Sequence, residues 1–572
     1  MDDAAPAVGL QTLDYIAVVG YLIVNAGIVY WASRKQEDTE DFFLGGRSMP
    51  WFAVGLSIMA TLLSTNTYLG APGEIIKYGP AYLIGNVAYP AAAIVVLCFW
   101  VPFFMRLRLT SAYEYLERRF DARIRWIGGL LFLGLRLGWM SMVIYTASMA
   151  MVTMALEPLT NFASLFGGCH PIYPVIAMIG IVATFYACVG GIRAVIWTDV
   201  LQAVMLFGGV AVIIGYVAWS ENSGVGTWWS TISSEQVKSP TPPLRWVSSD
   251  ITDRTTVLWA MMSLFTWNIC THCSDQVALQ RYFATTSLSS ARKSFLVNIV
   301  SAATIGILLS ISGLALRYYY LRHASLLPNG LTPESGADQL MPYFYAYQLP
   351  PGFGGLILVS FLCDAMQTLG SGVNSIAAVV STDLADANKN KGEKTSDATR
   401  AGSLFSARIV TLATGAVTTV LAMLAANFAM QSGKTIFDML PRMFNMFLAP
   451  LATMFMIGML YRRATPRVVL INVVLTQIFS SLWSWWGEVP ALLNRLGMPE
   501  LAARFTALLG VNSLGQPKTP SVLLAIAGPA LFGMAMGWVL SQLLGRDDHP
   551  GVEYSWRRVM SKPISYEQTK ID

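Results

Sequence analysis

Residues 56 to 74 read Leu56-Ser-Ile-Met-Ala60-Thr-Leu-Leu63-Ser64-Thr65-Asn66-Thr67-Tyr-Leu-Gly70-Ala-Pro72-Gly73-Glu74. The stretch lies in an apolar run long enough to cross a bilayer, yet four consecutive polar residues and a Gly-Ala-Pro-Gly sequence interrupt it. A helix broken inside a membrane frees backbone carbonyls that can bind a cation and amides that can face an anionic or hydroxylated solute. The alternative is a proline kink whose hydroxyl groups are satisfied within the helix.

The composition predicts an all-α protein that crosses a membrane many times. Of the 572 residues, 54% are hydrophobic and only 12% are charged, whereas soluble domains carry about 25% charged residues. Apolar runs of about 20 residues, the length that crosses a bilayer as a helix, recur along the chain. Six scattered cysteines form no disulfide framework.

The apolar runs predict about 13 transmembrane helices, with boundaries uncertain by a few residues. They span approximately 10–32, 50–76, 81–105, 125–156, 171–190, 195–219, 255–279, 293–321, 351–385, 402–429, 434–461, 466–486 and 520–544.

The distribution of Lys and Arg predicts the orientation of these helices. About 25 of the 38 basic residues fall on alternate loops, including the dense cluster from Arg106 to Arg125. Because cytoplasmic loops carry the excess of basic residues, this side is predicted to be cytoplasmic. The N-terminus then lies outside and the C-terminus inside, in the cell (cytoplasmic or inner) membrane. The longer segments 220–254, 322–350 and 487–519 fall outside, and the last could hold a short amphipathic helix.

The second to sixth and the seventh to eleventh predicted helices form two sets of five. Five is an odd number, so the second set must lie inverted relative to the first. Inverted repeats are typical of secondary transporters, whose sites form where the first helix of each repeat is interrupted. The seventh helix has its own polar centre, from Thr266 to Gln276. Two interrupted helices in matching positions favour a transporter over a simple kink.

A carboxylate at the mouth of an apolar run, Asp199, must face water, a partner or a bound cation. By itself it is equally consistent with a residue that pairs with nearby Arg193. The whole string from Gly190 to Gly209, however, resembles the signature of the solute:sodium symporter family, which includes the sodium/glucose cotransporters. Four more motifs resemble the family in the right order: Asp41 to Trp51, Ser274 to Arg281, Asn374-Ser375 with Thr382-Asp383, and Tyr461 to Thr465.

The resemblance covers roughly residues 40 to 465 and implies a five-plus-five inverted-repeat, leucine-transporter-like core. It implies a sodium-coupled symporter, not an enzyme, that imports a small organic solute by alternating access. The corresponding division is an extra N-terminal helix and loop (1–40), the first repeat (41–220), an extracellular loop (221–254), the second repeat (255–465), additional C-terminal helices (466–545) and a cytoplasmic tail (546–572).

The family's common sodium site, carried over by position, uses the carbonyls of Ala60 and Leu63 together with Asp364, Gln367 and Thr368. Several neutral oxygens can replace the hydration shell of Na⁺. Here the chain departs from the family, which usually has a small or hydroxyl residue in place of Asp364 and a serine in place of Gln367. Asp364 could strengthen a sodium site, titrate and couple protons, or pair with an intramembrane arginine, since burial raises the pKa of unpaired carboxylates.

Some family members have a second sodium site, which implies a second cation site at Asp199 and Ser371. Gly370 and Gln367 stand where that site would have serines. The positions that bind solute in sugar-transporting members correspond to Thr67, Asn86, Asn268, Ala302 and Arg442.

The solute-binding positions fit a sugar only in part. Asn268 fits the pattern, whereas the carboxylate expected at Asn86 and the lysine expected at Ala302 are missing. Arg442 would suit an acidic solute, because its guanidinium binds carboxylates bidentately, or it neutralises Asp364 or Asp438. Arg136 is a second candidate for an acidic solute, and is otherwise a water-facing or interface residue. The predicted solute is therefore a sugar, an acidic sugar or another carboxylate.

Other classes of protein are less consistent with the sequence. Cys270, His272 and Cys273 lack the second ligand pair that a structural zinc site needs, so no transition metal is predicted. A channel would have short repeated filter loops, which are absent. A proton-coupled symporter using Asp364 and a transporter-derived sensor without net flux stay as alternatives. The predicted partners are the solute, Na⁺ and the lipid bilayer, with no nucleic acid, and the functional unit is predicted to be the monomer.

Overall fold

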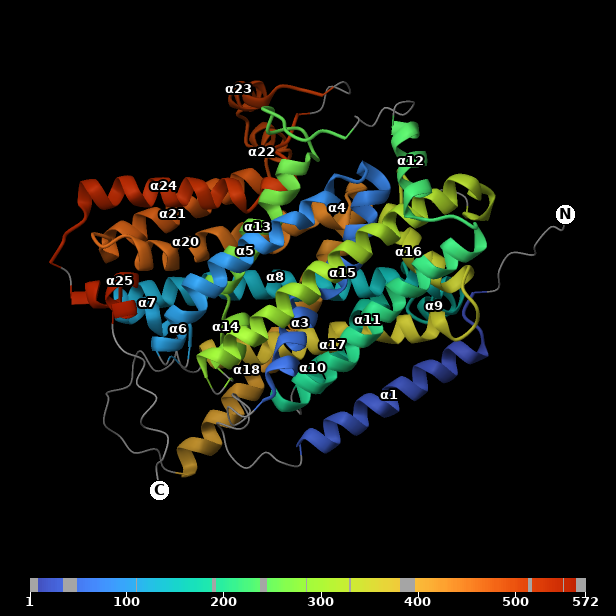
Figure 1. The fold of residues 1–572 in the computed structure, drawn as a ribbon, viewed down its shortest axis with the longest axis horizontal. Helices are drawn as coiled ribbons and strands as arrows, with labels where there is room; N and C mark the ends of the chain where they lie inside the picture. Colours follow the sequence, from blue (N-terminus) through green and yellow to red (C-terminus); the bar gives the residue numbers. More distant parts are fainter. Residues whose placement is uncertain are drawn as a thin grey trace.

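A helix occupies each of the thirteen predicted membrane segments in the computed structural model (Figure 1). Eleven of these segments are long and apolar enough to cross a membrane, counted over the described residues. The other two are the shorter α10 (Ile172–Ala187) and the polar α13 (Val257–Ser274). The structure describes residues 9–33, 49–107, 109, 111–187, 192–236, 244–283, 285, 287–328, 331–380, 397–512, 517–548 and 550–561.

The first set of five predicted helices contains several irregular elements. Its second member consists of five consecutive short pieces, whereas each of the other four is assigned as one helix. The elements are α3 (Trp51–Tyr78), then α4 (Ala81–Gly85), η2 (Asn86–Ala88), α5 (Tyr89–Val95), η3 (Val96–Trp100) and α6 (Val101–Leu107), then α8 (Ala122–Met154), α10 and α11 (Ile192–Ser220).

The second set of five is likewise irregular at its first and last members. Its elements are α13 with α14 (Gln276–Phe283), α15 (Leu288–Arg322), α17 (Phe353–Val379), α18 (Asp397–Ser432), and α19 (Ile436–Leu440) with η7 (Pro441–Asn445) and α20 (Met446–Leu460). Flanking the two sets are α1 (Thr12–Ser33), α21 (Pro466–Ser484) and η8 (Val522–Leu524) with α24 (Ala527–Leu544).

The predicted interruption of the second membrane segment is present in α3. Ser64 has φ 47° and ψ 162°, which is not helical and is rarely adopted by a residue with a side chain. The amide of Thr65 would bond to the carbonyl of Thr61 in a regular helix. It instead donates to the carboxylate of Asp364 on α17, at 2.6 Å. The break therefore frees backbone groups between Ala60 and Ser64 in the interior of the protein.

The seventh membrane segment is also broken, at one residue of the predicted polar centre. Asp275 is extended, with φ −82° and ψ 117°, between α13 and α14. Its Oδ1 accepts a hydrogen bond from the amide of Val277 at 2.9 Å, so the side chain caps the start of α14. Both repeats thus begin with a divided helix, as the sequence indicated.

Two segments expected to be loops contain helices. The segment 220–254 holds α12 (Val225–Gln236), and 322–350 holds η4 (Ala324–Leu326) and α16 (Ala337–Tyr347). The polar composition of the segment 322–350 gave no indication of α16, because one of its buried contacts is made with a distant part of the chain. Asp338 accepts a hydrogen bond from the amide of Ile436 at the start of α19, at 2.7 Å.

Short helices also lie in the other connections and near the end of the chain. The segment 487–519 holds two of them, where one was expected. All the short helices of these regions are α7 (Glu114–Arg119), α9 (Leu156–Ser164), α22 (Val489–Arg495), α23 (Pro499–Leu509), η9 (Pro550–Tyr554) and α25 (Trp556–Ser561).

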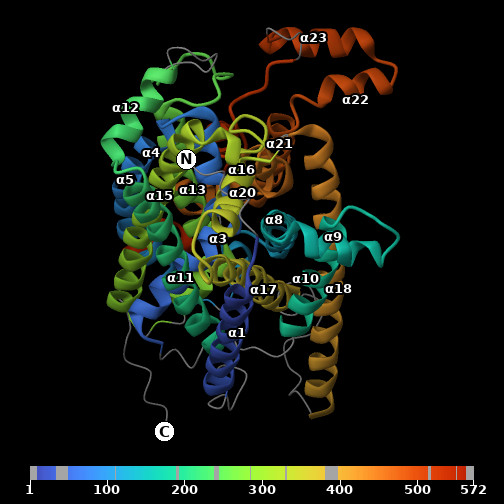
Figure 2. The same ribbon diagram turned by 90° about the vertical axis from the view of Figure 1, so that its right-hand side faces the viewer.

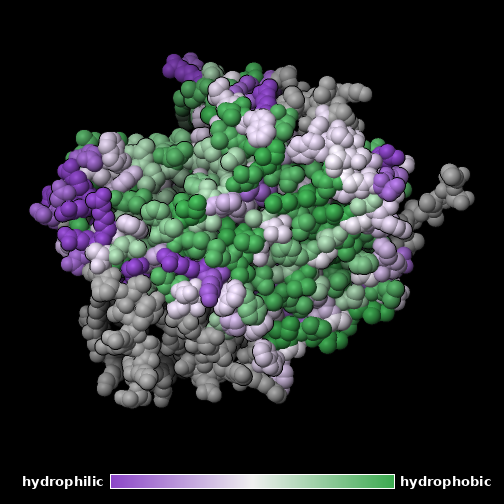
Figure 3. All heavy atoms as spheres, viewed as in Figure 1, coloured by the Kyte–Doolittle hydropathy of each residue, from purple (hydrophilic) through white to green (hydrophobic). Residues whose placement is uncertain are grey.

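The arrangement of the helices places α3 and α8 in the interior, while α1 and α18 lie at the periphery (Figures 1 and 2). Figure 3 shows hydrophobic residues over much of one face, with hydrophilic residues gathered at its left edge beside α25 and the end of α24. Such a hydrophobic face is expected of a surface in contact with lipid chains, because lipid requires no polar side chains.

Candidate functional site

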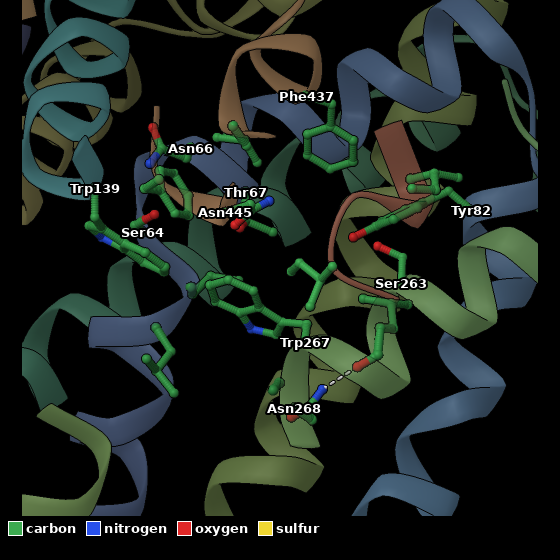
Figure 4. Close-up of a pocket in the computed structure, with 18 of the residues that line it drawn as sticks. Ser64, Asn66, Thr67, Tyr82, Trp139, Ser263, Trp267, Asn268, Phe437 and Asn445 are labelled. Carbon is green, nitrogen blue, oxygen red and sulfur yellow. Dashed lines mark hydrogen bonds between the residues drawn. The ribbon is translucent and has the colours of Figure 1, made fainter. Parts of the chain in front are cut away.

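A cavity of about 120 Å³ lies beside the break in α3. A single water molecule needs about 10–15 Å³ of such space, so the cavity has room for a small organic molecule. Its polar lining consists of neutral side chains from both repeats, several of which face one another in Figure 4. They are Ser64, Asn66, Thr67, Ser263, Asn268, His272, Asn298 and Asn445.

Aromatic side chains form much of the remaining wall. The rings of Trp139 and Trp267 stack with centroids 5.3 Å apart, and Phe444 lies 4.9 Å from Trp139. Tyr82 and Phe437 line another part of the cavity and contact each other edge to face, at 5.3 Å. A rigid aromatic wall with a few amide and hydroxyl groups is typical of a site for a small organic solute.

Three of the positions predicted to surround the solute lie on this cavity. Thr67, Asn268 and Ala302 all line it. The Nδ2 of Asn268 donates to the carbonyl of Leu264 at 2.8 Å (Figure 4), which fixes the orientation of the amide.

Asn86, in contrast, does not line the cavity. Its Nδ2 donates to the backbone carbonyls of Tyr82 and Leu83, at 3.2 and 3.0 Å, at the turn where α4 passes into η2. Asn86 therefore stabilises an irregular helix junction beside the cavity.

Arg442 also lies away from the cavity lining. Its Nη1 donates to the carbonyl of Asp438 at 2.6 Å, and its Nη2 lies 3.1 Å from the carboxylate of Glu488. Of the two readings that the sequence left open, the structural one fits these contacts, but the carboxylate is neither Asp364 nor Asp438. Glu488 lies between α21 and α22, and nothing near it in the sequence predicts that it would reach Arg442.

The residues predicted to bind sodium on α17 are buried against the break in α3. Asp364, Gln367 and Thr368 are each 4% exposed or less. Asp364 accepts hydrogen bonds from the amide and the hydroxyl of Thr65. These two hydrogen bonds come from the broken helix and not from an intramembrane arginine.

Unpaired polar atoms accompany Asp364 at this place. Within the described residues, both polar atoms of the Gln367 amide and the hydroxyl of Ser64 are buried without a hydrogen-bond partner. Buried polar groups are normally paired, so unpaired ones point to a bound ion or water. The carbonyl of Thr368 accepts a hydrogen bond from Ser371 at 3.3 Å. The oxygens needed to hold a hard cation are therefore available around the break.

At the second predicted cation position, the carboxylate of Asp199 already has an ion-pair partner and hydrogen-bond partners within the protein. Its carboxylate lies 3.5 Å from Nη2 of Arg281 and accepts a hydrogen bond from Ser57 at 2.5 Å. Arg281 also donates to Ser57 and Thr61 on α3, at 3.1 and 2.6 Å. The side chain of Arg193, the neighbour considered from the sequence, lies outside the described residues, as do most of the Asp41–Trp51 motif and Thr382-Asp383.

Arg136 and Asp275 form an ion pair that is almost completely buried, with 2% and 3% of their side chains exposed. The expectation that Arg136 faces water or an interface is therefore wrong. The guanidinium lies over the ring of Trp139, 5.3 Å from its centroid, and so braces the aromatic wall as well as the break between α13 and α14.

A segment outside the two repeats closes part of the cavity. Val522, Leu523 and Ile526, in and after η8, belong to the lining. The neighbouring Ser521 fixes this turn, because its Oγ donates to the carbonyl of Arg254 at 2.5 Å and its amide to that of Ile251 at 2.8 Å. The sequence carried no signal for this contribution, since the partners are more than 250 residues apart.

The comparisons with known proteins agree on one family. The model described as the sodium:solute symporter family matches residues 42–474. The sodium/sialic acid symporter NanT of Aliivibrio fischeri is 29% identical over 475 residues, which cover 82% of this chain and 87% of that protein. The human sodium-coupled monocarboxylate transporter 1 is 32% identical over 379 residues, covering 65% of this chain and 58% of that protein.

A solved structure, that of a Na⁺-coupled sialic acid symporter in a substrate-bound outward-open state, has the same fold. The two superpose with a TM-score of 0.70 at 24% identity, over 94% of this chain and 99% of the other.

Proposed function

This chain belongs to the sodium:solute symporter family and is a sodium-coupled symporter that works by alternating access, and we propose that its solute is a small organic acid, such as an acidic sugar. The names of its relatives include sialic acid and monocarboxylates as solutes, both of which carry a carboxylate. The geometry that supports this proposal is the cavity beside the broken helix α3.

A carboxylate is favoured in this cavity by the position of a helix terminus. The second half of α3 begins directly after Ser64, and Asn66 and Thr67 in its first turn line the cavity. The amides at the start of a helix carry a partial positive charge and attract anions. Among the described residues, the cavity lining contains neutral polar groups and no Lys or Arg, so this terminus would supply the attraction. Thr67 and Asn268 would then hold the polar groups of the solute.

We place sodium at the carbonyls of Ala60 and Leu63 together with Asp364, Gln367 and Thr368. The support is the broken backbone at Ser64, the carboxylate against Thr65 and the unpaired amide of Gln367. In the binding order we propose, sodium reduces the freedom of α3 and completes the cavity before the solute binds, which couples the two. A second cation at Asp199 and Ser371 has less support, because Arg281 already neutralises Asp199.

The chain is a multi-pass membrane protein, and we propose that it lies in the cytoplasmic membrane with the N-terminus outside and the C-terminus inside. The excess of Lys and Arg on alternate loops supports this orientation. The monomer, without nucleic acid, would be the functional unit, because the cavity and the proposed sodium site are built within one chain.

Uptake into liposomes containing the purified protein tests the function. A sodium gradient is expected to drive accumulation of a labelled sialic acid or a short monocarboxylate, and not of glucose. Uptake of glucose alone would overturn the acidic solute. Uptake driven by a proton gradient without sodium would overturn sodium coupling and favour protonation of Asp364.

Replacement of Thr368 by alanine tests the sodium site. Loss of one ligand oxygen is expected to raise the sodium concentration for half-maximal uptake roughly tenfold. The matched control is Thr418→Ala, a buried hydroxyl on α18 that bonds within its own helix. An unchanged sodium requirement in Thr368→Ala would rule out this placement.

A further inference from the structure

The first helix, α1, lies outside the two repeats but contacts α17, which carries the proposed sodium ligands (Figures 1 and 2). Only 17% of its membrane-spanning window is buried inside the protein. Among its residues whose burial is described, three are buried, Asp14, Tyr21 and Asn25, with 4%, 5% and 7% of each exposed. They follow at intervals of seven and four residues and therefore lie on one face of the helix.

This pattern is unusual because each of these three buried side chains carries a polar group, while the apolar residues whose burial is described in α1 are exposed or only partly buried. A helix that served only as a lipid-facing support would need no buried polar groups, which are costly in a membrane unless they are paired. The contacts of these three residues therefore indicate what α1 does.

Asp14 caps the start of α17 from outside that helix. Its Oδ1 accepts hydrogen bonds from the amides of Gly352 and Gly355, at 2.8 and 2.7 Å. The first amides of a helix have no partner within the helix, and a carboxylate there also interacts favourably with the helix dipole. The backbones are in close contact, since a Cβ on Gly355 would clash with the carbonyl oxygen of Asp14.

Tyr21 and Asn25 contact α17 again, further along its length. Asn25 donates to Sγ of Cys363 at 3.5 Å, and Tyr21 packs against Cys363 and Val359. Cys363 directly precedes Asp364, whose carboxylate bonds to Thr65 at the break in α3. Neighbouring residues on a helix point about 100° apart, so this part of α17 is held between α1 and the broken helix.

We propose that α1 is a positioning element for the sodium site, in which Asp14 sets the position of α17 along its axis and Asn25 sets its rotation. This inference rests on the proposed placement of sodium between α3 and α17. With both contacts present, Asp364, Gln367 and Thr368 are aligned with the freed carbonyls of α3. When either contact is lost, α17 can shift, and the ligand oxygens no longer converge on one ion.

The test compares Asp14→Ala and Asn25→Leu with the conservative Asp14→Asn, in liposomes with a sodium gradient. Asp14→Ala and Asn25→Leu are each expected to raise the sodium concentration for half-maximal uptake about tenfold. The KM for solute at saturating sodium is expected to stay within about twofold, because the cavity lining is untouched. Asp14→Asn keeps an acceptor for the amides of α17 and is expected to recover most of the sodium affinity. Ile23→Ala, on the exposed face of α1, is the matched control.

Sodium-dependent thermal stabilisation of the purified variants provides a second readout that does not require transport. Folded Asp14→Ala and Asn25→Leu proteins that keep the sodium dependence of the parent would overturn the inference, as would equal rises in the sodium requirement and the solute KM. Thr368→Ala separates this result from failure of the proposed sodium site. An effect of Thr368→Ala without an effect of the α1 variants refutes the role of α1 alone, whereas no effect of Thr368→Ala refutes the site itself.

Discussion

At the scale of single residues, Asp364 differs most from the family pattern, and its charge is expected to act on the cation. Asp364→Asn keeps an oxygen that can accept the hydrogen bonds from Thr65 but removes the negative charge. We expect the sodium concentration for half-maximal uptake to rise at least about fivefold, because a unit charge near a bound cation is worth at least about 1 kcal/mol.

The dependence of uptake on pH distinguishes the roles of Asp364. If the carboxylate carries a proton instead, the variant would lose the pH dependence of uptake while its sodium requirement stays unchanged. Sodium titrations of liposome uptake between pH 6 and 8 separate these outcomes, and a variant unaltered in both respects would make Asp364 purely structural.

Asp338 on α16 is expected to make the stability of the protein depend on pH. Burial raises the pKa of Asp338 from 3.8 to about 7, and the nearby carboxylates of Glu74 and Asp438 act in the same direction. The hydrogen bond from the amide of Ile436 and the charge of Lys77 lower the pKa and offset only part of this rise. A raised pKa means that the folded protein holds a proton that the unfolded chain releases. The stabilisation is therefore complete below pH 3.8 and is lost as the pH rises through about 7.

The variant Asp338→Asn tests this, because the amide stays neutral at every pH. Its melting temperature in detergent is expected to change less than that of the parent between pH 5 and 8, and to be higher than that of the parent at pH 8. A parent curve that rises with pH across this range, and equally so in the variant, would contradict the assignment.

The sequence could place some residues of the candidate site but not others, for a physical reason. Thr67 and Asn268, on the two broken helices, and Ala302, on α15, line the cavity at positions that the family resemblance implied. Arg442 could not be placed, because its orientation depends on Glu488, which approaches from a segment outside the repeats. Side chains with several hydrogen-bond donors turn toward whichever acceptor folding brings near, and local sequence does not record that acceptor.

At the scale of elements, the break between α13 and α14 is expected to depend on the pair of Arg136 and Asp275. Removing one partner leaves the other charge buried without compensation, which costs about 3–5 kcal/mol. Arg136→Gln is therefore expected to lower the melting temperature strongly. The double variant Arg136→Gln with Asp275→Asn leaves no charge and keeps an oxygen to cap α14, so it is expected to recover much of the loss.

Thermal unfolding of the two single variants and the double variant measures this coupling. Single effects that simply add in the double variant would show that the pair does not hold the junction.

The position of both helix breaks could be predicted from sequence, because clustered polar residues in an apolar run oppose a continuous helix. The short pieces from α4 to α6 and the π-helical turn at Pro441–Asn445 were not predicted. Prolines lie in these pieces at positions 90, 102 and 441, and each removes one backbone hydrogen-bond donor. The exact form of the irregularity also depends on side-chain contacts, such as the local hydrogen bonds of Asn86 and the long-range ion pair of Arg442.

At the scale of the whole molecule, Arg254 joins the ends of two helices that flank the cavity. It bonds to Glu74 near the end of α3, at 2.9 Å for Nη2, and to Asp438 on α19. Thr67 and Phe437, on the same two elements, line the cavity. Because the carbonyl of Arg254 also accepts the hydrogen bond from Ser521, the segment leading to η8 is attached to the same place. These interactions of Arg254 with Glu74, Asp438 and Ser521 form a tie across one end of the cavity. In the orientation that we propose, this end faces outside.

Loss of this tie is expected to shift the alternating-access equilibrium toward the form open to the outside. Arg254→Gln removes the charge that holds Glu74, whose side chain is fully buried, and Asp438. A two-state protein responds to the loss of contacts made in one state by populating the other. A cysteine at Thr67, with Cys98 and Cys169 replaced by serine, is then expected to react about tenfold faster with an impermeant thiol reagent. Arg245→Gln, which removes an exposed ion pair with Asp253, is the control and is expected to leave the rate unchanged. An equal or slower rate in folded Arg254→Gln would mean that the tie does not close the cavity.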